Sequence, residues 1–405
     1  MDPQPTTPAT PAARRPALAV LLVFLRLGLT SFGGPVAHLG YFRAEFVERR
    51  RWLDDRGFTD LVALCQFLPG PSSSQVGIAI GMLRAGWLGS LAAWVGFTLP
   101  SAVLMILAAQ GLAGHAWLAQ SGVVHGLKLA AAAVVAQAVW GMARSFCTDR
   151  ARIGVALVAA MLTWALPGAM GQLGAIALSA AVGVRWLRAG TALPGEHVSF
   201  GVSRRAGAVL LAVFAVLLLG LPVLAAGLGS TLLRLVDGFF RAGALVFGGG
   251  HVVLPLLQSV VVPSGAVSNA DFLAGYGAAQ AAPGPLFAFA AFLGALIPTA
   301  WPAWFAGLGF LLAIFLPAWL LVLGALPFWD SLRRRARMRA AMAGVNAGVV
   351  GILLSALVDP VGTSAIHGWG DAALALAAFG LLVFARVSPL VVVALAAAGG
   401  LLAAA

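Results

Sequence analysis

Residues 24–39 read FLRLGLTSFGGPVAHL, and residues 239–254 read FFRAGALVFGGGHVVL. Seven of the sixteen positions are identical, including an arginine and a Gly-Gly pair. Farther along, FTDLVALCQFLPGP at 58–71 lines up with FLAGYGAAQAAPGP at 272–285, sharing Phe, Gln and Pro-Gly-Pro. These identities carry more weight than matches of Ala or Leu, which are common in an apolar chain. The sequence therefore predicts two copies of one structural unit.

A third landmark keeps the same register. Pro100 and Pro317 each stand inside a long apolar run, and equivalent positions stay between 214 and 217 residues apart. We therefore expect a disordered cytoplasmic tail at 1–16 and a first repeat at 17–187. A basic cytoplasmic linker at 188–206 and a connecting transmembrane helix at 207–230 precede a second repeat at 231–405.

The composition is that of a membrane protein. Hydrophobic residues make up 61% of the 405 residues and charged residues only 9%, whereas soluble domains carry roughly 25% charged residues. A soluble core also stops growing near about 250–300 residues, so much of this apolar surface must face lipid. We therefore expect an all-α polytopic membrane protein with the lipid bilayer as its solvent.

The net charge of +12 rests on 24 arginines and one lysine. The arginines cluster between apolar runs, as at 49–51, 204–205 and 333–335. This pattern is typical of cytoplasmic loops and argues against a nucleic-acid partner.

The basic loops also predict the relative orientation of the two copies. Loop 43–56 carries five arginines, and its counterpart 258–271 has no basic residue. In the second copy, 330–340 carries five arginines, and its counterpart 113–124 has none. Reversal of the bias predicts two inverted-topology repeats in a bacterial inner membrane, with a cytoplasmic N-terminus.

Glycine and proline interrupt the apolar segments at related places. The tail and loop 43–56 are both expected in the cytoplasm, so the segment between them must enter and return, with its break at Gly33-Gly34-Pro35. Pro69-Gly70-Pro71 interrupts 58–85 in the same way. Each arm of about 12–16 residues is shorter than the ~30 Å hydrocarbon core. We expect re-entrant hairpins, with tilted full spans as the alternative.

The remaining apolar runs predict further elements. In the first copy, full spans are expected at 87–112, 123–144, 151–166 and 171–187. In the second copy, hairpins at 232–257 and 272–298 precede spans at 303–329, 341–358, 372–386 and 388–404.

Four breaks at related places indicate a central anion site. Non-helical backbone inside a bilayer is costly unless it is buried in protein or lines a watery cavity. A new helix begins at each break, and each helix N-terminus carries about +0.5 charge, so four such ends suit a dianion. The helices that end at the breaks carry the opposite sign, so their C-terminal ends must be turned aside.

The first copy supplies most of the polar candidates. Pro71 suits the first turn of a helix, Ser72, Ser73 and Ser74 offer hydroxyl groups, and Gln75 offers an amide. The second copy has Leu286, Phe287 and Ala288 in the corresponding run. In the alternative interpretation, the serines only satisfy the start of their own helix.

Two arginines are candidate anion ligands. Arg26 lies about nine residues into the first apolar run, or roughly 14 Å deep, without an acidic residue three or four positions away. Its counterpart Arg241 has Asp237 four residues before it, which could neutralise it. Arg26 is therefore the better candidate, with a structural arginine bonded to backbone carbonyls as the alternative.

Histidines and glutamines complete the site. His38 and His251 could bind the anion or carry a proton, or serve as structural hydrogen bonders. Gln66 and Gln280 either line the path or join helices. No metal or cofactor is expected. The full set of substrate-binding candidates is Arg26, Ser31, Gly33, Gly34, His38, Gln66, Gly70, Ser72, Ser73, Ser74, Gln75, Arg241, Gly248, Gly249, Gly250, His251, Gln280 and Gly284, with helix breaks at Pro35, Pro69, Pro71, Pro283 and Pro285.

On these residues the sequence resembles the chromate ion transporter family in its long, two-domain form. The matching stretches are LRLGLTSFGGPVAHLGYFR (25–43) and LCQFLPGPSSSQVGIAIGMLRAG (64–86), with weaker matches in FGGGHVVLPLL (247–257) and AAPGP (281–285). The resemblance implies chromate efflux from the cytoplasm and chromate resistance, with sulfate as a related anion.

The expected function is therefore secondary transport of chromate or a sulfate-like oxyanion, by a chain that could also form a homodimer. The alternatives are a permease for sulfate or another oxyanion and an uncoupled anion channel. A membrane enzyme acting on lipid phosphates would need clustered acids, a metal set or a nucleophile–base pair. The thirteen acidic residues and six histidines are scattered without such a pattern, so we do not expect an enzyme.

Overall fold

The computed structural model describes residues 16–32, 34–114, 122–166, 169–187, 200–246, 252–329, 331 and 335–404. These residues form helices and contain no strand. Among them, the helices long and apolar enough to cross a membrane are Ser72–Ala113, Gly122–Phe146, Arg204–Gly227, Ala303–Phe328 and Ala336–Asp359. The chain is an all-α polytopic membrane protein, as its composition predicts. The predicted tail and most of the predicted linker lie outside the described residues.

The first half begins with two interrupted helix pairs. Helices α1 (Ala17–Thr30) and α2 (Gly34–Arg43) flank the first break, and α2 continues into the π-helical η1 (Ala44–Arg49). Non-helical residues 68–71 separate α3 (Asp55–Phe67) from α4 (Ser72–Gly114). Helix α4 is interrupted again at Ala85 and Gly86, where Gly86 has φ +63°. The predicted break at Pro69-Gly70-Pro71 is therefore confirmed.

The second half repeats this order. Helices α10 (Thr231–Ala244) and α11 (Val253–Val261) flank its first break. Residues 282–285 separate α12 (Asn269–Ala281) from η3 (Leu286–Ala288), which continues as α13 (Phe289–Leu296). Helix α14 (Ala303–Ala325) and η4 (Leu326–Phe328) follow. The predicted break around Gly248–Gly250 lies outside the described residues.

The remaining helices follow the core of each half. In the first half they are α6 (Gly122–Phe146), α7 (Arg150–Ala165) and α8 (Ala169–Trp186), followed by the connecting helix α9 (Arg204–Gly227). In the second half they are α16 (Ala336–Ala356) with its extensions η5 (Leu357–Gly362) and α17 (Thr363–Ala365), and then α18 (Trp369–Val383) and α19 (Pro389–Ala404).

Glycine contacts hold the first helix of each half against the long helix of the same half. A Cβ atom at Gly28 of α1 would lie 2.7 Å from the carbonyl oxygens of Gly96 and Phe97 in α4. A Cβ atom at Gly243 of α10 would lie 2.0 Å from the carbonyl oxygen of Ile314 in α14. Small residues allow such close helix contacts within a membrane. The predicted register pairs Gly28 with Gly243, so both halves use the same contact.

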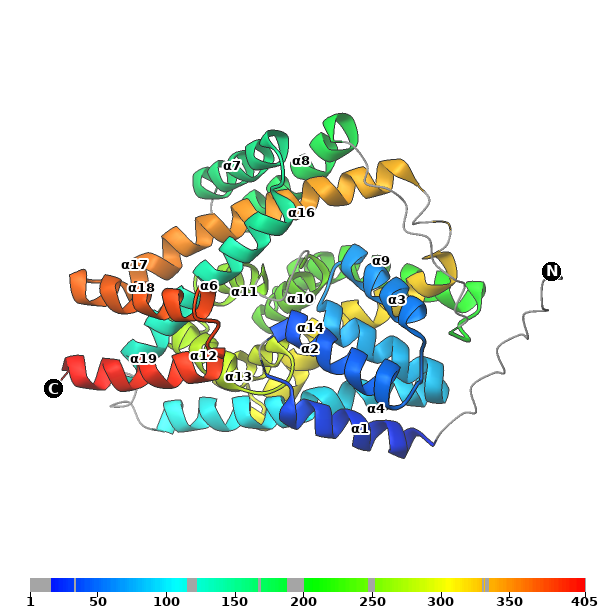
Figure 1. The fold of residues 1–405 in the computed structure, drawn as a ribbon, viewed down its shortest axis with the longest axis horizontal. Coiled ribbons are helices and arrows are strands. Elements are labelled where there is room, and N and C mark those ends of the chain that lie inside the picture. The colour runs from blue at the N-terminus through cyan, green and yellow to red at the C-terminus, as the bar shows by residue number, and fades with distance from the viewer. Residues whose placement is uncertain are drawn as a thin grey trace, which may run out of the picture.

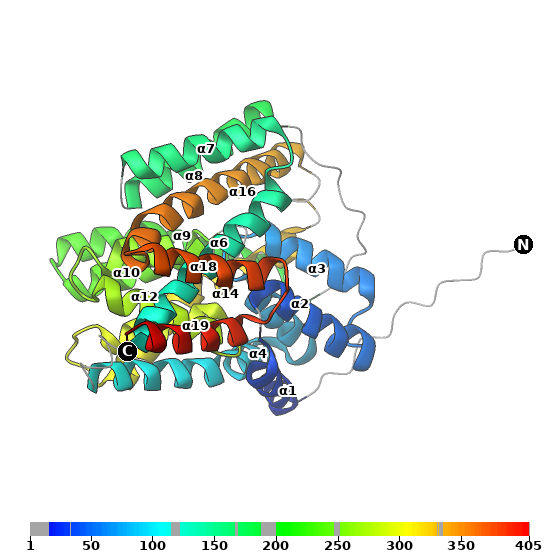
Figure 2. The ribbon, with the colours of Figure 1, turned by 60° about the vertical axis from the view of Figure 1, so that its left-hand side comes forward.

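The later helices are exchanged between the halves (Figures 1 and 2). Helices α7 and α8 of the first half lie beside α16 of the second, and α18 and α19 of the second half lie beside α6 of the first. A Cβ atom at Gly183 would lie 2.3 Å from the oxygen of Ala340, and one at Gly400 would lie 2.1 Å from that of Gly122. We call α6, α18 and α19 the first arm, and α7, α8 and α16 the second arm. Helices α1–α4 and α10–α14 form the core.

Two backbone hydrogen bonds cross between the halves of the core. The N–H of Gly70 donates to the oxygen of Val246 at 2.7 Å, and the N–H of Gly284 donates to the oxygen of Ser31 at 2.9 Å. Gly70 and Gly284 are equivalent in the predicted register, as are Ser31 and Val246. Each half thus donates from its second break to the first break of the other half. Such a reciprocal exchange is the contact pattern of two units related by a two-fold axis.

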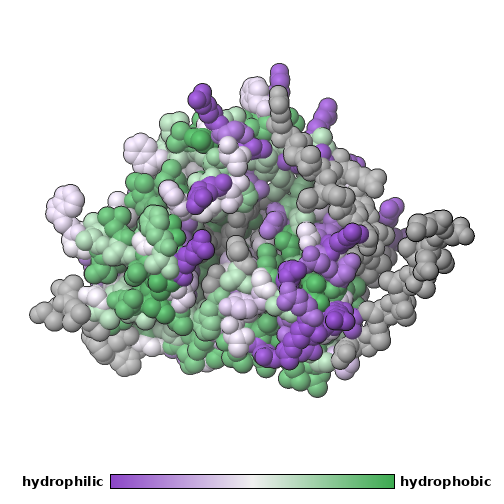
Figure 3. Space-filling model, viewed as in Figure 1, coloured by the Kyte–Doolittle hydropathy of each residue, from purple (hydrophilic) through white to green (hydrophobic). Residues whose placement is uncertain are grey.

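Hydrophobic side chains cover much of the face shown in Figure 3. Hydrophilic side chains gather at its top, near α7 and α8, and on the side where α3 lies. Ion pairs join this charged region, with Arg43 2.7 Å from Asp55 and Arg49 3.0 Å from Glu45. Both arginines and Asp55 are exposed and only Glu45 is mostly buried, so each pair contributes little stability.

Candidate functional site

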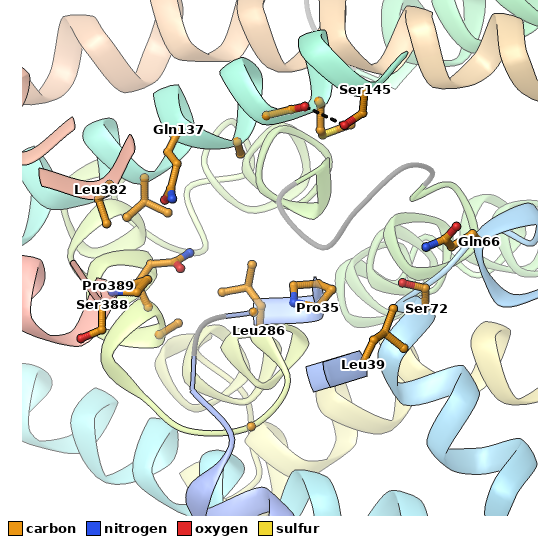
Figure 4. Close-up of a pocket in the computed structure, with 18 of the residues that line it drawn as sticks. Pro35, Leu39, Gln66, Ser72, Gln137, Ser145, Leu286, Leu382, Ser388 and Pro389 are labelled. Atoms are coloured by element: carbon orange, nitrogen blue, oxygen red, sulfur yellow. Dashed lines mark hydrogen bonds between the residues drawn. The ribbon is translucent and has the colours of Figure 1, made fainter. Parts of the chain in front are cut away.

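A cavity of about 830 Å³ lies where the broken helices of the core meet the tip of the α18–α19 hairpin. Side chains from both halves surround it, with Gln66 at the end of α3, Gln137 on α6 and Ser388 before α19 around the same space (Figure 4). The cavity therefore lies between the core and the first arm.

Several helices begin at the wall of this cavity. Gly34 starts α2, Ser72 starts α4, Leu286 starts the η3–α13 helix and Pro389 starts α19, and all four residues line the cavity. Three of these are helix starts that the sequence predicts at the Gly/Pro breaks. The fourth predicted start, before α11, lies outside the described residues. The start of α19 agrees with the span predicted at 388–404, but the sequence did not predict that it would line the site. Partial positive charge at these ends favours a bound anion.

Helix C-terminal carbonyls at the breaks are turned toward the opposite half. The oxygen of Ser31, which follows α1, accepts the hydrogen bond of Gly284, and the oxygen of Val246, after α10, accepts that of Gly70. These bonds satisfy two of the carbonyls whose negative ends would oppose an anion. They also occupy the N–H groups of Gly70 and Gly284. Both glycines line the cavity, but their amides brace the core and are not free donors.

Neutral polar groups line much of the remaining wall. The amides belong to Gln66, Gln137, Gln280 and Asn346. Among the described residues, Nε2 of Gln280 and Oδ1 of Asn346 have no hydrogen-bond partner although both atoms are buried. Buried polar groups are usually satisfied, so these two point to a ligand or water. Hydroxyl groups come from Ser72, Ser145 and Ser388.

Arg386 is the one charged residue among the described residues that line the cavity. It stands between α18 and α19, next to Val387, Ser388 and Pro389, which also line the wall. The described wall contains no acidic residue. The cavity thus combines one cation with neutral donors and helix N-termini, a combination suited to an anion.

Seven residues named by the sequence pattern line the cavity: Gly34, Pro35, Gln66, Gly70, Ser72, Gln280 and Gly284. Five other candidates, Ser31, His38, Ser73, Ser74 and Gln75, are buried beside the breaks and are not among the lining residues. The four remaining break prolines, Pro69, Pro71, Pro283 and Pro285, flank the lining glycines without lining the cavity.

The buried candidates brace the first half of the core. Nε2 of Gln75 donates to the oxygen of Pro69 at 2.8 Å and so spans the Pro-Gly-Pro break. Nδ1 of His38 lies 3.4 Å from Oγ of Ser73, and its ring packs edge-on against Phe97. This arrangement suits the structural alternative for Ser73 and Gln75, and a structural histidine.

The two predicted arginines lie away from this cavity. Arg26 is exposed on α1 and does not line the cavity. Arg241 pairs with Asp237 at 2.9 Å, as the sequence predicts, and donates to the oxygen of Leu218 at 2.8 Å. It lines a separate cavity of about 540 Å³ between α8, α10 and α11, together with Arg234 and Gln172.

Five candidates lie outside the described residues: Gly33, Gly248, Gly249, Gly250 and His251. Within the described part of the chain, no group of three or more His, Cys, Asp or Glu side chains could hold a metal ion.

Sequence reasoning missed Gln137, Asn346, Ser145, Ser388 and Arg386. Gln137 and Asn346 are polar residues within long apolar helices. Arg386 had a usable signal, because α18 and α19 have only 15 and 16 residues and a full span needs about 20. Both helices, expected as full spans at 372–386 and 388–404, are therefore shorter than a full span, and the turn that joins them carries Arg386 to the cavity wall.

Comparisons of the sequence with known proteins identify its family. The family model described as chromate transporter matches the chain twice, over residues 18–232 and 233–401. The chain is 29% identical to the chromate transport protein of Pseudomonas aeruginosa over 389 residues, covering 88% of this chain and 85% of that protein. It is also 29% identical to the chromate transport protein of Cupriavidus metallidurans over 396 residues, covering 95% and 92%.

A cyanobacterial relative gives a similar match. The probable chromate transport protein of Synechococcus elongatus is 27% identical over 359 residues, covering 85% of this chain and 84% of that protein. No solved structure matches the chain.

Proposed function

The chain belongs to the chromate transporter family, and from this premise we propose that it is a secondary transporter carrying chromate out of the cytoplasm, which gives chromate resistance. The observation that carries the proposal is the cavity between the core and the first arm. It offers amide and hydroxyl donors, helix N-termini and one guanidinium, and no acidic residue from the described part of the chain. Chromate is a tetrahedral dianion whose four oxygens accept hydrogen bonds from such groups.

The proposed transport cycle moves the first arm against the core. Gln137, Arg386 and Ser388 belong to the first arm, whereas Gln66 and Ser72 belong to the core. An anion held between these two walls contacts both, so its binding and release are coupled to their separation. Rocking of one bundle against another around a fixed site is a common form of alternating access.

We further propose that the two halves are inverted repeats in a bacterial inner membrane, with the N-terminus in the cytoplasm. The reversed arginine bias of the loops supports this orientation. The reciprocal bonds from Gly70 to Val246 and from Gly284 to Ser31 support a two-fold relation between the halves. A two-fold axis within the membrane plane would exchange inward-facing and outward-facing conformations between the halves.

Sulfate is expected to share the site. Chromate and sulfate are both tetrahedral dianions, and the donors that line the cavity would bind the anion's oxygens and not distinguish chromium from sulfur. Sulfate should therefore compete with chromate, and the family assignment is what favours chromate as the cargo.

The test is uptake of radiolabelled chromate by inverted membrane vesicles or proteoliposomes containing the purified chain. We expect saturable accumulation above vesicles without the protein, reduced by excess sulfate and altered by an imposed proton gradient if protons are coupled. Equilibration without accumulation under every imposed gradient would indicate an uncoupled channel. Absence of any protein-dependent chromate flux would overturn the proposal.

A further inference from the structure

Arg386 is the single cation that the described chain presents to the cavity, and it lies at the tip of the α18–α19 hairpin. We propose that Arg386 sets the charge selectivity of the site, favouring doubly charged over singly charged tetrahedral anions. This inference rests on the proposed function and deepens it, because it assigns substrate selectivity to one residue in the C-terminal half.

The backbone of Arg386 is in an unfavourable conformation. Its φ is +54°, in the left-handed region that glycine adopts most easily. On either side, the N–H of Ala385 donates to the oxygen of Gly380 and the N–H of Val387 donates to that of Leu381, ending α18. Nothing in this turn requires an arginine, and glycine would fit it with less strain. Strained residues of this kind concentrate at functional sites, and this one lies on the cavity wall.

The guanidinium of Arg386 is available to a ligand. The residue is exposed and lines the cavity, and it makes no hydrogen bond or ion pair with another described residue. Arg241 differs, because Asp237 neutralises it. A guanidinium that lines a cavity without a protein partner needs water or an anion as its counterpart.

The first arm holds Arg386 in a fixed relation to Gln137. A Cβ atom at Gly126 of α6 would lie 2.0 Å from the oxygen of Ala396 in α19, so the two backbones are in direct contact. Nε2 of His125 on α6 lies 2.7 Å from Oδ1 of Asp371 on α18. The hairpin and α6 therefore form one body, and the charge of Arg386 and the amide of Gln137 reach the anion together.

The second arm has no equivalent charge to offer. The tip of the α7–α8 hairpin reads LPGAM at 166–170. One full positive charge interacts about twice as strongly with a dianion as with a monoanion at the same distance. Losing that charge should therefore weaken dianion binding more than monoanion binding, whereas a general loss of folding would weaken both alike.

The experiment measures anion binding to the full-length protein in detergent and transport in proteoliposomes, using sulfate and chromate as dianions and perchlorate as a tetrahedral monoanion. Arg386→Gln removes the charge, Arg386→Lys keeps it, and Arg386→Gly removes it while relieving the strained backbone. Arg26→Gln is the matched control, because it removes an arginine on an apolar helix outside the cavity.

We expect Arg386→Gln and Arg386→Gly to weaken dianion binding by about 10-fold or more, since a hydrogen bond to a charged group contributes about 1.5–3 kcal/mol. The ratio of perchlorate to sulfate dissociation constants should fall in both variants and be largely kept in Arg386→Lys and Arg26→Gln. Unchanged sulfate affinity and an unchanged ratio in both neutral variants would overturn the inference while leaving the proposed function intact. A wild-type protein that neither binds nor moves any oxyanion would instead overturn the proposed function.

Discussion

Gly70 and Gly284 hold equivalent places in the two halves, and each donates a backbone hydrogen bond to the first break of the other half. The residues after them differ, since polar Ser72–Gln75 follow Gly70 and apolar Leu286, Phe287 and Ala288 follow Gly284. The hairpin tips differ in the opposite sense, because the α18–α19 turn carries Arg386 and 166–170 carries no charge. The backbone contacts thus occur in both halves, whereas each polar or charged group occurs in only one half.

This division has a physical reason. Helix packing must satisfy the same constraints wherever the same unit is used, so its glycines recur. A single anion needs only one set of ligands, and two arginines facing the same cavity would repel each other when no anion separates them. The comparison therefore predicts that substitutions at equivalent backbone contacts have equal effects in the two halves. Substitutions of polar or charged residues that only one half carries should have unequal effects.

The largest effect is expected in the two arms. A Cβ atom at Gly344 would lie 2.0 Å from the oxygen of Ser179, and one at Gly400 would lie 2.1 Å from that of Gly122. Gly344→Val and Gly400→Val should each separate two helices whose backbones touch, so both should abolish a folded, monodisperse protein on size-exclusion chromatography. Gly154→Val and Gly380→Val are the controls, because no outside atom lies within 4 Å of a Cβ atom at either site. Folding of only one tight-contact variant would break the equivalence of the arms.

A smaller effect, and a difference between the halves, is expected at the crossing bonds. Gly70 and Gly284 have φ of +121° and +90°, so alanine at either site should cost about 1–3 kcal/mol. A Cβ atom at Gly284 would also lie 3.1 Å from the backbone oxygen of Phe97, whereas one at Gly70 meets the end of the flexible Gln75 side chain at 2.8 Å. Thermal unfolding midpoints in detergent should fall further for Gly284→Ala. A larger fall for Gly70→Ala would contradict this account, because it would show that the backbone around Gly284 accommodates a Cβ atom more easily than the backbone around Gly70.

The paired arginines should respond unequally. Arg241→Gln leaves the mostly buried carboxylate of Asp237 without its partner and should lower stability by about 1–2 kcal/mol, allowing for the partial exposure of the pair. Arg26→Gln should change stability by less than about 0.5 kcal/mol. Asp237→Asn combined with Arg241→Gln should recover part of the loss in the unfolding midpoint. Equal losses for the two single variants would contradict this account.

The smallest effect is expected for the hydroxyl groups of two adjacent serines, Ser72 and Ser73. Ser72 lines the cavity, whereas Ser73 is buried beside His38. Ser72→Ala should weaken sulfate or chromate affinity by about 2–10-fold, the value of one net hydrogen bond, without changing the unfolding midpoint. Ser73→Ala should leave affinity unchanged and lower the midpoint slightly. Equilibrium binding and thermal unfolding of both variants would decide between a ligand and a structural role for each serine.

Glycine and proline made much of the core predictable. Because proline cannot continue a helix and glycine frees the backbone, Pro69-Gly70-Pro71 and Pro283-Gly284-Pro285 locate breaks that the structure contains. The predicted start of a span at 87 also agrees with the interruption of α4 at Ala85 and Gly86. Period and composition are local properties, so a single sequence reveals them.

The ligands of the cavity were harder to predict. Depth along a helix suggested Arg26, but depth does not reveal which face meets the interior, and Arg26 lies on the exposed face of α1. Arg386 was overlooked because an arginine between two apolar runs is already explained as a loop residue. Exchange of hairpins between the halves brings Gln137 and Arg386 to one wall although they are far apart in sequence, and no local pattern predicts that meeting.

The exchanged arms also impose an order on biogenesis. Between Trp186 at the end of α8 and Ala336 at the start of α16, the ribosome adds about 150 residues, which takes roughly 8–30 s at 5–20 residues per second. During that time the helix face carrying Ser179 and Gly183 lacks the partner that it contacts in the finished protein. Lipids or the insertion machinery must shield this face until α16 arrives, so the protein completes its second arm only after most of its chain has been inserted.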